Sequence, residues 1–384
     1  MTDLPSEFPL PEAVFERQRL LLGASVAPAQ PARPIRWRVV AIAAVVVVGG
    51  VLVMPGLSLG SRLLHLIQGK PTFPEVQAPV WSPDGRTIAF LRAKKGDFRG
   101  AVYVVSAEGR DQRKLSPDSA YDSVPRWSPE GRQILVTRSH KDPMLGADIW
   151  VMNADGGGQR NLTPGAGSDI TPAWSPDGRM IAFVRDHQGL LEIYVMNADG
   201  SGQRNLTPGR GPAVPPAWSP DGRRIAFTSS RERGAGNLDI YVMNADGSAQ
   251  RRLARGWSPA WSPDGRRIAF VSRRDGNLEL YVMSPDGSEQ RRLTRNTEAD
   301  WLPVWSPDGQ KIAFLRHGKP EIYVMSADGS RQRNLTRNSA YDSDLAWSPD
   351  PQRLTFISDR SGKFEVYVMK ADGSEQRRLT QRRP

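Results

Sequence analysis

The chain has 384 residues, no cysteine and a formal net charge of +11, with 39% hydrophobic and 8% aromatic residues. This length and apolar content predict a globular protein with a sizeable core and exclude a disordered chain. The lack of cysteine excludes disulfides and thiolate metal sites, and the positive charge is a modest excess spread along the chain.

Residues 1–36 predict a flexible cytoplasmic tail. The stretch from Ala27 to Pro34 is rich in proline and alanine, which is typical of a linker. Apolar residues earlier in the tail, at Phe8, Leu10 and Val14, leave open a short amphipathic helix that docks on a cytoplasmic partner.

Residues 37–58 predict one transmembrane helix. Val39 to Leu57 is a run of 19 residues without a charge. As a helix this run would measure about 28 Å, close to the roughly 30 Å hydrocarbon core of a bilayer. Arg33, Arg36 and Arg38 precede it, so the positive-inside rule places the N-terminus in the cytoplasm and the rest of the chain outside the membrane. A cleaved signal peptide is the alternative, with an unusually long basic leader.

Residues 59–76 are interpreted as a linker, and residues 77–384 as a repeat domain. Seven tryptophans mark the repeats: Trp81, Trp127, Trp174, Trp218, Trp261, Trp305 and Trp347. The steps between them are 46, 47, 44, 43, 44 and 42 residues. A period near 44 with four short strand signals in each unit predicts an all-β fold, a β-propeller of seven four-stranded blades. Six blades are the fallback if one unit does not close into the ring.

The fifth repeat shows the pattern within one unit. After Trp261, the segment Ser262–Gly265 predicts a type I turn, because Pro263 presets φ and the glycine can take φ > 0. The strand Arg267–Ser272 is apolar on both faces, as expected of a sheet that is covered by a neighbour on each side. The third strand, Leu280–Met283, has the same character.

The fourth strand of the unit is charged, and two of the seven turns depart from the repeat pattern. The fourth strand, near Gln290–Thr294, carries arginines and is predicted to be the wet outer edge. Glu130 replaces the turn aspartate in the second repeat. Pro351 replaces the turn glycine in the seventh, which predicts that this turn cannot take φ > 0 and must differ.

The motif W-S-P-D-G-R-x-I-A-F followed by I-Y-V-M-N-A-D-G resembles the Pro-Asp, WD40-like propeller repeat of TolB-type proteins and the propeller domains of prolyl-oligopeptidase-like enzymes. The resemblance covers about 80% of the chain, from Gln77 to Thr380. It implies a propeller and, on the TolB side, a binding role in the cell envelope. For TolB itself, the resemblance implies a six-bladed ring that follows a separate α/β domain. This chain has seven units, and no room for that domain is expected. The prolyl-oligopeptidase-like enzymes add a C-terminal hydrolase domain, which is not expected here because the repeats run almost to Pro384.

The first candidate site residues are four aspartates that lie five residues before a repeat tryptophan: Asp122, Asp169, Asp300 and Asp342. In a propeller the first strand of each blade lines the central channel, so these carboxylates are expected near one mouth of it. There they would hold a divalent cation or recognise a basic group. Alternatively, each aspartate caps its own local turn. Apart from this cation, no cofactor is predicted.

Two further features belong to the same face. Trp257 and Trp301 lie four residues before a repeat tryptophan and are candidate aromatic anchors for a partner or a sugar, or else packing residues under a loop. The loops between second and third strands vary while the framework repeats, as on a binding face carried by a rigid scaffold.

The outer-strand arginines are expected to form a solvated rim, or else to bind an anionic polymer. They are Arg160, Arg204, Arg251, Arg252, Arg291, Arg292, Arg333, Arg377 and Arg378.

Signals of catalysis are weak. The four histidines show no metal-ligand spacing, and the G-x-S-x-G match at Gly56–Gly60 lacks the strand–turn–helix context of a hydrolase. Asn-Leu-Thr, which fits a glycosylation sequon, recurs in the predicted outer strand at Asn161, Asn205 and Asn334. No basic groove with interleaved aromatic residues indicates a nucleic-acid partner.

The sequence thus predicts a non-enzymatic, membrane-anchored, extracytoplasmic propeller that binds a protein or an anionic envelope polymer. Two alternatives stay open. One is a hydrolase or lyase at the channel mouth, with the four aspartates as acid or base groups. The other is a sensor of an external ligand that signals through the N-terminal tail.

Overall fold

The computed structural model describes the chain from residue 75 to residue 380 with internal gaps. The described ranges are 75–93, 100–117, 120–140, 146–165, 167–187, 190–209, 213–230, 238–317 and 320–380. The predicted tail (1–36), transmembrane helix (37–58) and nearly all of the linker (59–76) lie outside these ranges, and so does the G-x-S-x-G match. Within the described ranges, no helix has both the length and the apolar character needed to cross a bilayer.

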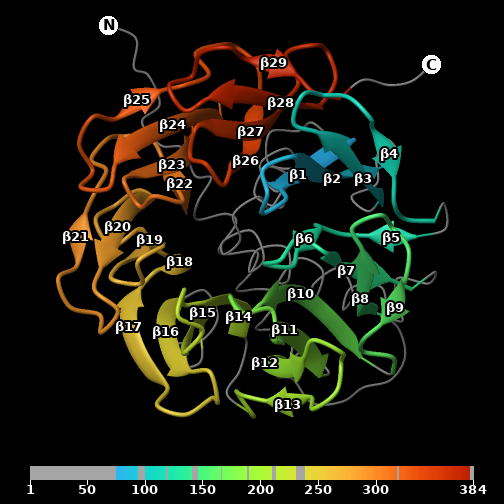
Figure 1. Ribbon diagram of the computed structural model, residues 1–384. Helices are drawn as coiled ribbons and strands as arrows, with labels where there is room; N and C mark the ends of the chain where they lie inside the picture. Colours follow the sequence, from blue (N-terminus) through green and yellow to red (C-terminus); the bar gives the residue numbers. More distant parts are fainter. Residues whose placement is uncertain are drawn as a thin grey trace, which may run out of the picture.

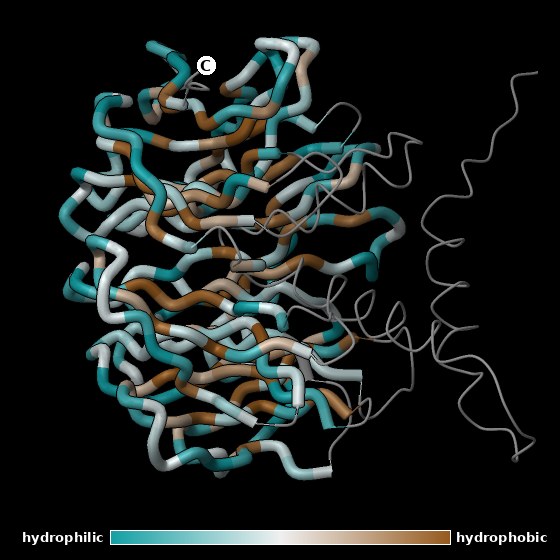
Figure 2. Tube along the Cα trace, turned by 90° about the vertical axis from the view of Figure 1, so that its right-hand side faces the viewer, coloured by the Kyte–Doolittle hydropathy of each residue, from teal (hydrophilic) through white to brown (hydrophobic). Residues whose placement is uncertain are grey.

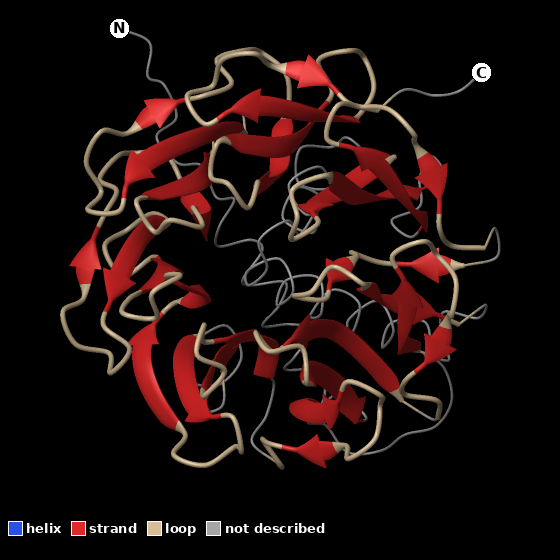
Figure 3. Cartoon of the chain, viewed as in Figure 1, coloured by secondary structure: helices blue, strands red, loops and turns tan. Residues whose placement is uncertain are grey.

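The described residues form an all-β structure, which confirms the predicted fold class. Its sheets are arranged in a ring around a common centre, with strands such as β1, β10, β18 and β26 innermost and β4, β13, β21 and β29 at the periphery (Figure 1). The elements are strands joined by turns and loops (Figure 3). Five sheets have four strands each, in chain order, and a sixth sheet has nine.

The nine-stranded sheet contains the first two sequence repeats. Its strands are β1 (Val76–Trp81), β2 (Thr87–Ala93), β3 (Gly100–Ser106), β4 (Arg113–Lys114), β5 (Tyr121–Asp122), β6 (Arg126–Trp127), β7 (Gln133–Ser139), β8 (Ala147–Asn153) and β9 (Arg160–Asn161). The two repeats are joined because β5, which pairs with β7 of its own repeat, also meets β3 of the first through Gly100 and Asp122.

Each four-stranded sheet contains one further repeat. Their strands are β10 (Ser168–Trp174), β11 (Met180–His187), β12 (Leu190–Asn197) and β13 (Arg204–Asn205); β14 (Ala213–Trp218), β15 (Arg224–Ser229), β16 (Asp239–Asn244) and β17 (Arg251–Arg255); β18 (Trp257–Trp261), β19 (Ile268–Ser272), β20 (Glu279–Met283) and β21 (Arg291–Arg292); β22 (Asp300–Trp305), β23 (Lys311–Arg316), β24 (Glu321–Ser326) and β25 (Arg333–Asn334); β26 (Asp342–Trp347), β27 (Arg353–Ser358), β28 (Glu365–Lys370) and β29 (Arg377–Arg378).

The turn after each repeat tryptophan is the predicted hairpin closure. In the fifth repeat, the Gly265 amide donates to the Ser262 carbonyl at 2.9 Å, and Gly265 has φ 68°. The Asp264 carboxylate accepts from the Ser262 hydroxyl at 2.6 Å and from the Arg266 amide at 3.0 Å. The turn is therefore held from inside, by its own serine and aspartate.

The turn of the seventh repeat lacks the bond from the glycine amide to the serine carbonyl, because Pro351 has no amide hydrogen. The turn therefore differs in this bond, as predicted, but the prediction that it cannot take φ > 0 is wrong. Pro351 lies at φ 25°, on the positive side that the prediction excluded. The Ser348 amide still donates to the Arg353 carbonyl at 2.9 Å, and the Asp350 carboxylate still accepts from the Gln352 amide at 3.2 Å. These bonds fix the turn around the proline. The φ value is far from the roughly −65° that the proline ring prefers, so the conformation is strained.

The innermost strands carry a recurring bulge. The pairing register with the second strand shifts at this point, for example between Trp301 and Val304. In five repeats the residue three before the tryptophan has a left-handed backbone: Ala78, Thr171, Ser258, Leu302 and Asp344. Such bulges bend a strand and increase its twist, which fits the sharp curvature near the centre of a ring of sheets.

The core lies between neighbouring sheets. In the fifth repeat Ile268 and Phe270 pack toward one neighbour and Ala269 and Val271 toward the other, and all four are fully buried, as predicted. Hydrophobic residues are concentrated in the strands and hydrophilic ones at the turns (Figure 2). Because successive side chains of a strand point to opposite faces and both sets are apolar, neighbouring sheets bury both faces of each sheet.

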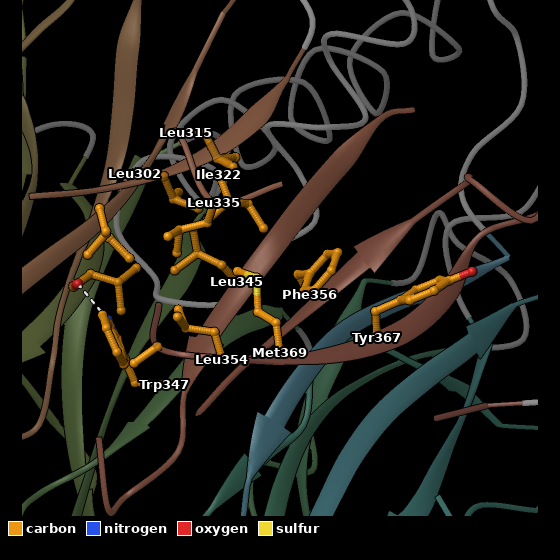
Figure 4. Packing of buried hydrophobic residues seen from close by; sticks show 14 residues of the cluster. Leu302, Leu315, Ile322, Leu335, Leu345, Trp347, Leu354, Phe356, Tyr367 and Met369 are labelled. Carbon is orange, nitrogen blue, oxygen red and sulfur yellow. Dashed lines mark hydrogen bonds between the residues drawn. The ribbon is translucent and has the colours of Figure 1, made fainter. Parts of the chain in front are cut away.

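Repeat tryptophans tie each sheet to the one before it. In five of the seven, the indole N–H donates to the main-chain carbonyl just before the preceding repeat tryptophan, and the bond from Trp347 to Val304 measures 3.1 Å (Figure 4). The same bond is made by Trp127, Trp218, Trp261 and Trp305. The repeat tryptophan is thus a packing residue of the sheet interfaces.

The two ends of the described chain meet without exchanging a strand. Strand β1 pairs with β2 and packs against the sheet of β26–β28. Across this seam the Ala78 amide donates to Asp344 Oδ2 at 3.1 Å, and Arg353 lies over the Trp81 ring at 4.9 Å. Side-chain packing and polar contacts therefore close the ring.

Candidate functional site

The ring has two different faces. The antiparallel register aligns the start of the first strand, the end of the second and the start of the third, as at Asp300, Arg316 and Glu321. We call this side, which also carries the loops between second and third strands, the loop face. The opposite side carries the Ser-Pro-Asp-Gly turns and is called the turn face.

The four candidate aspartates all lie on the loop face, each paired with an arginine sixteen or eighteen residues later in its own repeat. Arg138 donates from Nε to Asp122 Oδ1 at 2.6 Å and from Nη2 to Oδ2 at 3.0 Å. The aspartate is fully buried. The equivalent pairs are Asp169 with Arg185 (2.6 and 2.6 Å), Asp300 with Arg316 (2.7 and 2.9 Å) and Asp342 with Arg360 (3.0 Å).

These ion pairs stabilise the charged form of both partners. The hydrogen bond from Arg185 to Asp169 raises the pKa of this arginine. Burial lowers the pKa of Arg316, but the hydrogen bond and the charge of Asp300 outweigh burial and raise it. Removing one of these carboxylates would leave a largely buried arginine without its charged partner, which is costly.

Each arginine also connects its aspartate to the preceding sheet. Arg138 donates from Nη1 to Gln159 Oε1 at 3.0 Å, and Gln159 donates in turn to the Leu115 carbonyl of the preceding repeat at 3.1 Å. The guanidinium lies over the Trp150 ring at 4.6 Å. The counterparts Arg185, Arg316 and Arg360 repeat this with Gln203, Gln332 and Gln376. The aspartates therefore belong to polar chains that bind one sheet to the next.

The structure does not bring the four aspartates together into one cluster. They start strands of different sheets, and among the described residues no group of three or more His, Asp or Glu side chains could hold a metal ion. Asp122, Asp300 and Asp342 each also accept a hydrogen bond from a side chain four or six residues earlier, as expected of the local cap that was the alternative. Their role in binding a partner stays a prediction.

Trp257 and Trp301 lie on the innermost strands β18 and β22. Trp257 is 6% exposed and packs with Ala269, Val271 and Leu280, while Trp301 is half-buried against the same cluster. Both indole N–H groups are buried and lack a hydrogen-bond partner in the described part of the chain. The geometry is that of residues packed between sheets. Whether they also anchor a ligand remains to be tested.

The Asn-Leu-Thr triplets have a structural role on the loop face. Asn205 Nδ2 donates to Glu192 Oε2 at 2.9 Å, and its Oδ1 accepts from the Thr207 amide at 2.9 Å. The Thr207 hydroxyl accepts from the Ile193 amide at 2.8 Å. Asn161 and Asn334 make the same bonds to Asp148 and Glu321. The side-chain amide that a sugar would modify is therefore already engaged inside the fold.

Most arginines of the outer strands are contacts between sheets and not a free rim. Arg291 donates from Nη1 to the Asp328 carbonyl in the next sheet at 2.7 Å. The same position in every repeat reaches the next outer turn: Arg113, Arg160, Arg204, Arg251, Arg333 and Arg377. We call these seven residues the clasp arginines. Sequence reasoning missed this role, although their strict recurrence at the first position of the outer strand was a usable signal.

The histidines lie apart on the loop face. His140 Nε2 lies 3.4 Å from Asp148 Oδ2, and the His187 ring lies 6.3 Å from the Tyr194 ring. Burial lowers the pKa of His317, so it is neutral at pH 7. No two of the three share a sheet, which agrees with the lack of ligand spacing in the sequence.

The comparisons with known proteins fit this geometry. The family model of the TolB β-propeller domain matches residues 146–257, 256–316 and 303–383. The chain belongs to the TolB β-propeller domain family. A curated relative, the Tol-Pal system protein TolB 1 of Novosphingobium aromaticivorans, is 47% identical over 47 residues. This match covers 12% of the chain and only 10% of that relative, so it reflects about one repeat.

Solved structures share the fold at low sequence identity. A putative TolB from Agrobacterium tumefaciens is 24% identical with a TM-score of 0.52, covering 72% of this chain and 99% of that one. An oligogalacturonate lyase in complex with manganese is 16% identical with a TM-score of 0.62, covering 76% and 87%. A puromycin-hydrolysing peptidase of Mycobacterium tuberculosis is 16% identical with a TM-score of 0.63, covering 78% and 52%. These similarities establish the propeller architecture of this family member and leave its activity open.

Proposed function

We propose that this TolB-family chain is a non-enzymatic binding scaffold: a seven-bladed propeller, anchored by the helix at 37–58 and held outside the cytoplasm, that binds a protein or an anionic envelope polymer through its loop face. Seven blades follow if the nine-stranded sheet is counted as two repeats joined by β5. The seven clasp arginines, one for each repeat, support this count.

The observation that carries the proposal is that the charged groups of the loop face hold the scaffold together. The buried aspartates are each bonded to an arginine, and the buried acids of the third strands are bonded as well, as Asp239 is to Arg252 at 2.7 Å and Glu279 to Arg292 at 2.7 Å. The same face carries the loops that vary in sequence. A rigid framework with varied loops is the arrangement of a recognition surface.

One surface feature adds to this choice of face. Leu190, the first residue of β12, is 46% exposed and is the one large hydrophobic side chain that is exposed among the described residues. Lys363, in the hairpin between β27 and β28, is exposed on the same face. Both side chains are free to contact a partner without any change in the framework.

The binding experiment compares the two faces of the full chain. The solubilised protein is immobilised and presented with envelope extract, beside a loop-face variant (Leu190→Ser with Lys363→Glu) and a turn-face variant (Arg266→Glu). Arg266 is exposed, and its variant is the matched control. We expect the loop-face variant to lose the captured component and the control to keep it. Equal capture by all three would contradict the proposed face.

The topology is tested separately with introduced cysteines, because the native chain has none. Ser6→Cys places a thiol in the predicted tail, and Gln310→Cys places one in an exposed turn of the ring. In intact cells treated with a membrane-impermeant maleimide, we expect labelling of the ring and not of the tail. Labelling of both, or of the tail alone, would overturn the proposed orientation.

A further inference from the structure

Two arginines occupy matched positions in the fifth and seventh repeats, thirteen residues after the repeat tryptophan. In the seventh, Arg360 donates from Nε to the Ser358 hydroxyl at 2.8 Å and from Nη1 to Gln376 Oε1. Its Nη2 donates to Asp342 Oδ1 at 3.0 Å, and the guanidinium lies over the Tyr367 ring at 4.8 Å. This arginine therefore has a carboxylate on its Nη2 edge.

In the fifth repeat the same arrangement lacks the carboxylate. Arg274 donates from Nε to the Ser272 hydroxyl at 3.2 Å and from Nη1 to Gln290 Oε1 at 2.6 Å. It lies over the Tyr281 ring at 4.6 Å, as Arg360 lies over its tyrosine. Its Nη2, however, donates to the main-chain carbonyl of Arg255 at 3.2 Å. Among the described residues, the bonds of the Arg274 guanidinium all go to neutral acceptors.

The fifth repeat cannot provide the missing carboxylate from its own strand. Gly256 stands where the other repeats have Asp122, Asp169, Asp300 and Asp342. A Cβ atom at Gly256 would lie 2.4 Å from the Val271 carbonyl oxygen, and the glycine has φ 153°, so no side chain fits there. A carboxylate on the Nη2 edge of Arg274 has to come from outside this strand.

The surroundings of Arg274 favour an anion. Arg252 and Arg255 are exposed beside it, and Arg252 is paired with Asp239. Burial lowers the pKa of Arg274, and the charges of Arg252 and Arg255 lower it further, against the opposing effects of Tyr281 and Asp275. The pKa of Arg274 is thus shifted in the opposite direction to the pKa of Arg185 and of Arg316, which their own aspartates raise. A negative charge is thus provided for those arginines and lacking at Arg274.

The acidic residue that follows Arg274 in the chain is engaged elsewhere. Asp275 accepts a hydrogen bond from the Tyr281 hydroxyl, and its Oδ2 lies 3.6 Å from Arg292 Nη1. Arg292 is also bonded to Glu279 at 2.7 Å. Asp275 therefore lowers the local potential without occupying the Nη2 edge of Arg274.

We propose that the exposed guanidinium of Arg274, flanked by Arg252 and Arg255, binds the carboxylate group of a ligand, which replaces the neutral Arg255 carbonyl as the acceptor of Nη2 and provides the negative charge that Asp342 provides beside Arg360. Arginine suits this ligand because a guanidinium N–H donates a charge-assisted hydrogen bond to a carboxylate, which is stronger than the bond that Nη2 donates to a main-chain carbonyl. The hairpin that carries Arg274 is fully described and exposed, so the site is open to solvent on the loop face. The site is defined by the repeat geometry and does not depend on which partner the whole ring binds.

The test uses sodium acetate as the probe and thermal unfolding of the full chain as the readout, at constant ionic strength set with chloride. The variants are Arg274→Lys and, as its matched control, Arg360→Lys. Lysine keeps the charge but cannot place a planar guanidinium N–H at the position of Nη2, so the apparent affinity for acetate is expected to fall about fivefold or more in Arg274→Lys. The control, whose arginine already has Asp342, is expected to respond as the wild type does.

A second variant tests whether an equivalent carboxylate site forms in the seventh repeat once its own aspartate is removed. Asp342→Gly removes the internal carboxylate of Arg360, and added acetate is expected to restore part of the lost stability. Phosphate and sulfate run in parallel to separate a carboxylate site from a general anion site. The proposal fails if Arg274→Lys responds to acetate as the wild type does, or if chloride, sulfate and acetate act alike.

Discussion

Asp300 and Arg316 form a two-point ion pair between strands β22 and β23, with Nε to Oδ1 at 2.7 Å and Nη2 to Oδ2 at 2.9 Å. The aspartate side chain is 0% exposed and the arginine side chain 14%. Asn296 Nδ2 adds a third hydrogen bond to Oδ2 at 2.6 Å. The carboxylate is thus fully satisfied within its own repeat, and its removal strands a buried cation.

The first prediction is that Asp300→Ala destabilises the ring strongly. Breaking a buried ion pair by removing one partner costs about 3–5 kcal/mol, because the other charge stays buried and unpaired. The double variant Asp300→Ala with Arg316→Met is expected to recover much of this loss. Urea unfolding of the wild type and the two variants checks the prediction. A single variant as stable as the wild type would mean that water solvates Arg316 in the folded state.

These aspartates also show what the sequence could and could not predict. The strand faces and the turn at Ser262–Gly265 are confirmed because their signals are local. These signals are a short continuous run of apolar residues, and a proline and a glycine at fixed offsets. The partner of Asp300 is sixteen residues away, across a hairpin whose register the sequence alone did not specify. The recurring spacing of Asp and Arg within the repeats contains this information, but the prediction considers the aspartates without these arginines.

Other misses have a different physical cause. The burial of Trp257 depends on the neighbouring sheet, which packs Trp301 against the same cluster, and no pattern within one repeat contains that contact. The role of Arg291 depends on the turn of the next sheet in the same way. Pro351 was expected to exclude φ > 0 from its turn, but the hydrogen bonds around it hold the backbone on the positive side, against the preference of the proline ring.

The second prediction follows from this strain. Pro351→Gly is expected to stabilise the protein by about 1 kcal/mol, the net of relieving a strained φ and adding the backbone entropy of glycine to the unfolded chain. It also restores an amide that can donate to the Ser348 carbonyl, as Gly309 does to Ser306 at 2.8 Å. The converse change, Gly309→Pro, is the control and is expected to destabilise. Chemical unfolding of both variants decides the matter, and a loss of stability in Pro351→Gly would show that the proline is well tolerated.

The third prediction concerns acid stability. The hydrogen bond from Ser262 lowers the pKa of Asp264, and serine hydroxyls lower the pKa of Asp84, Asp177, Asp221, Asp199, Asp246, Asp286, Asp328 and Asp372 in the same manner. A carboxyl whose pKa is lower in the folded state contributes stability above its unfolded value of about 3.9. That contribution is lost as the pH falls through the folded pKa, because the unfolded chain binds protons first.

The ring is therefore expected to lose stability steeply below about pH 4. Ser262→Ala removes the bond that lowers the pKa of Asp264, so this variant is expected to be less stable at pH 7 and to show a smaller further loss on acidification. Unfolding by urea at pH 7, 5 and 3 measures both effects. Parallel pH curves for the variant and the wild type would contradict the assignment.

The fourth prediction concerns the seam where the ring closes. Arg377 donates from Nη2 to the Ala107 carbonyl at 2.8 Å and from Nη1 to the Glu108 carbonyl at 3.1 Å, which joins the last sheet to the first. Arg377→Met keeps much of the apolar stem and removes both bonds, so a loss of about 1 kcal/mol is expected. The adjacent Arg378 is exposed, and Arg378→Met is the matched control with the same change of charge. Hydrogen exchange of the β1 and β28 amides is expected to speed up in the first variant and not in the second, because the two seam bonds to Ala107 and Glu108 come from Arg377. Equal exchange in both variants would show that packing of β1 against β26–β28 closes the ring without this clasp.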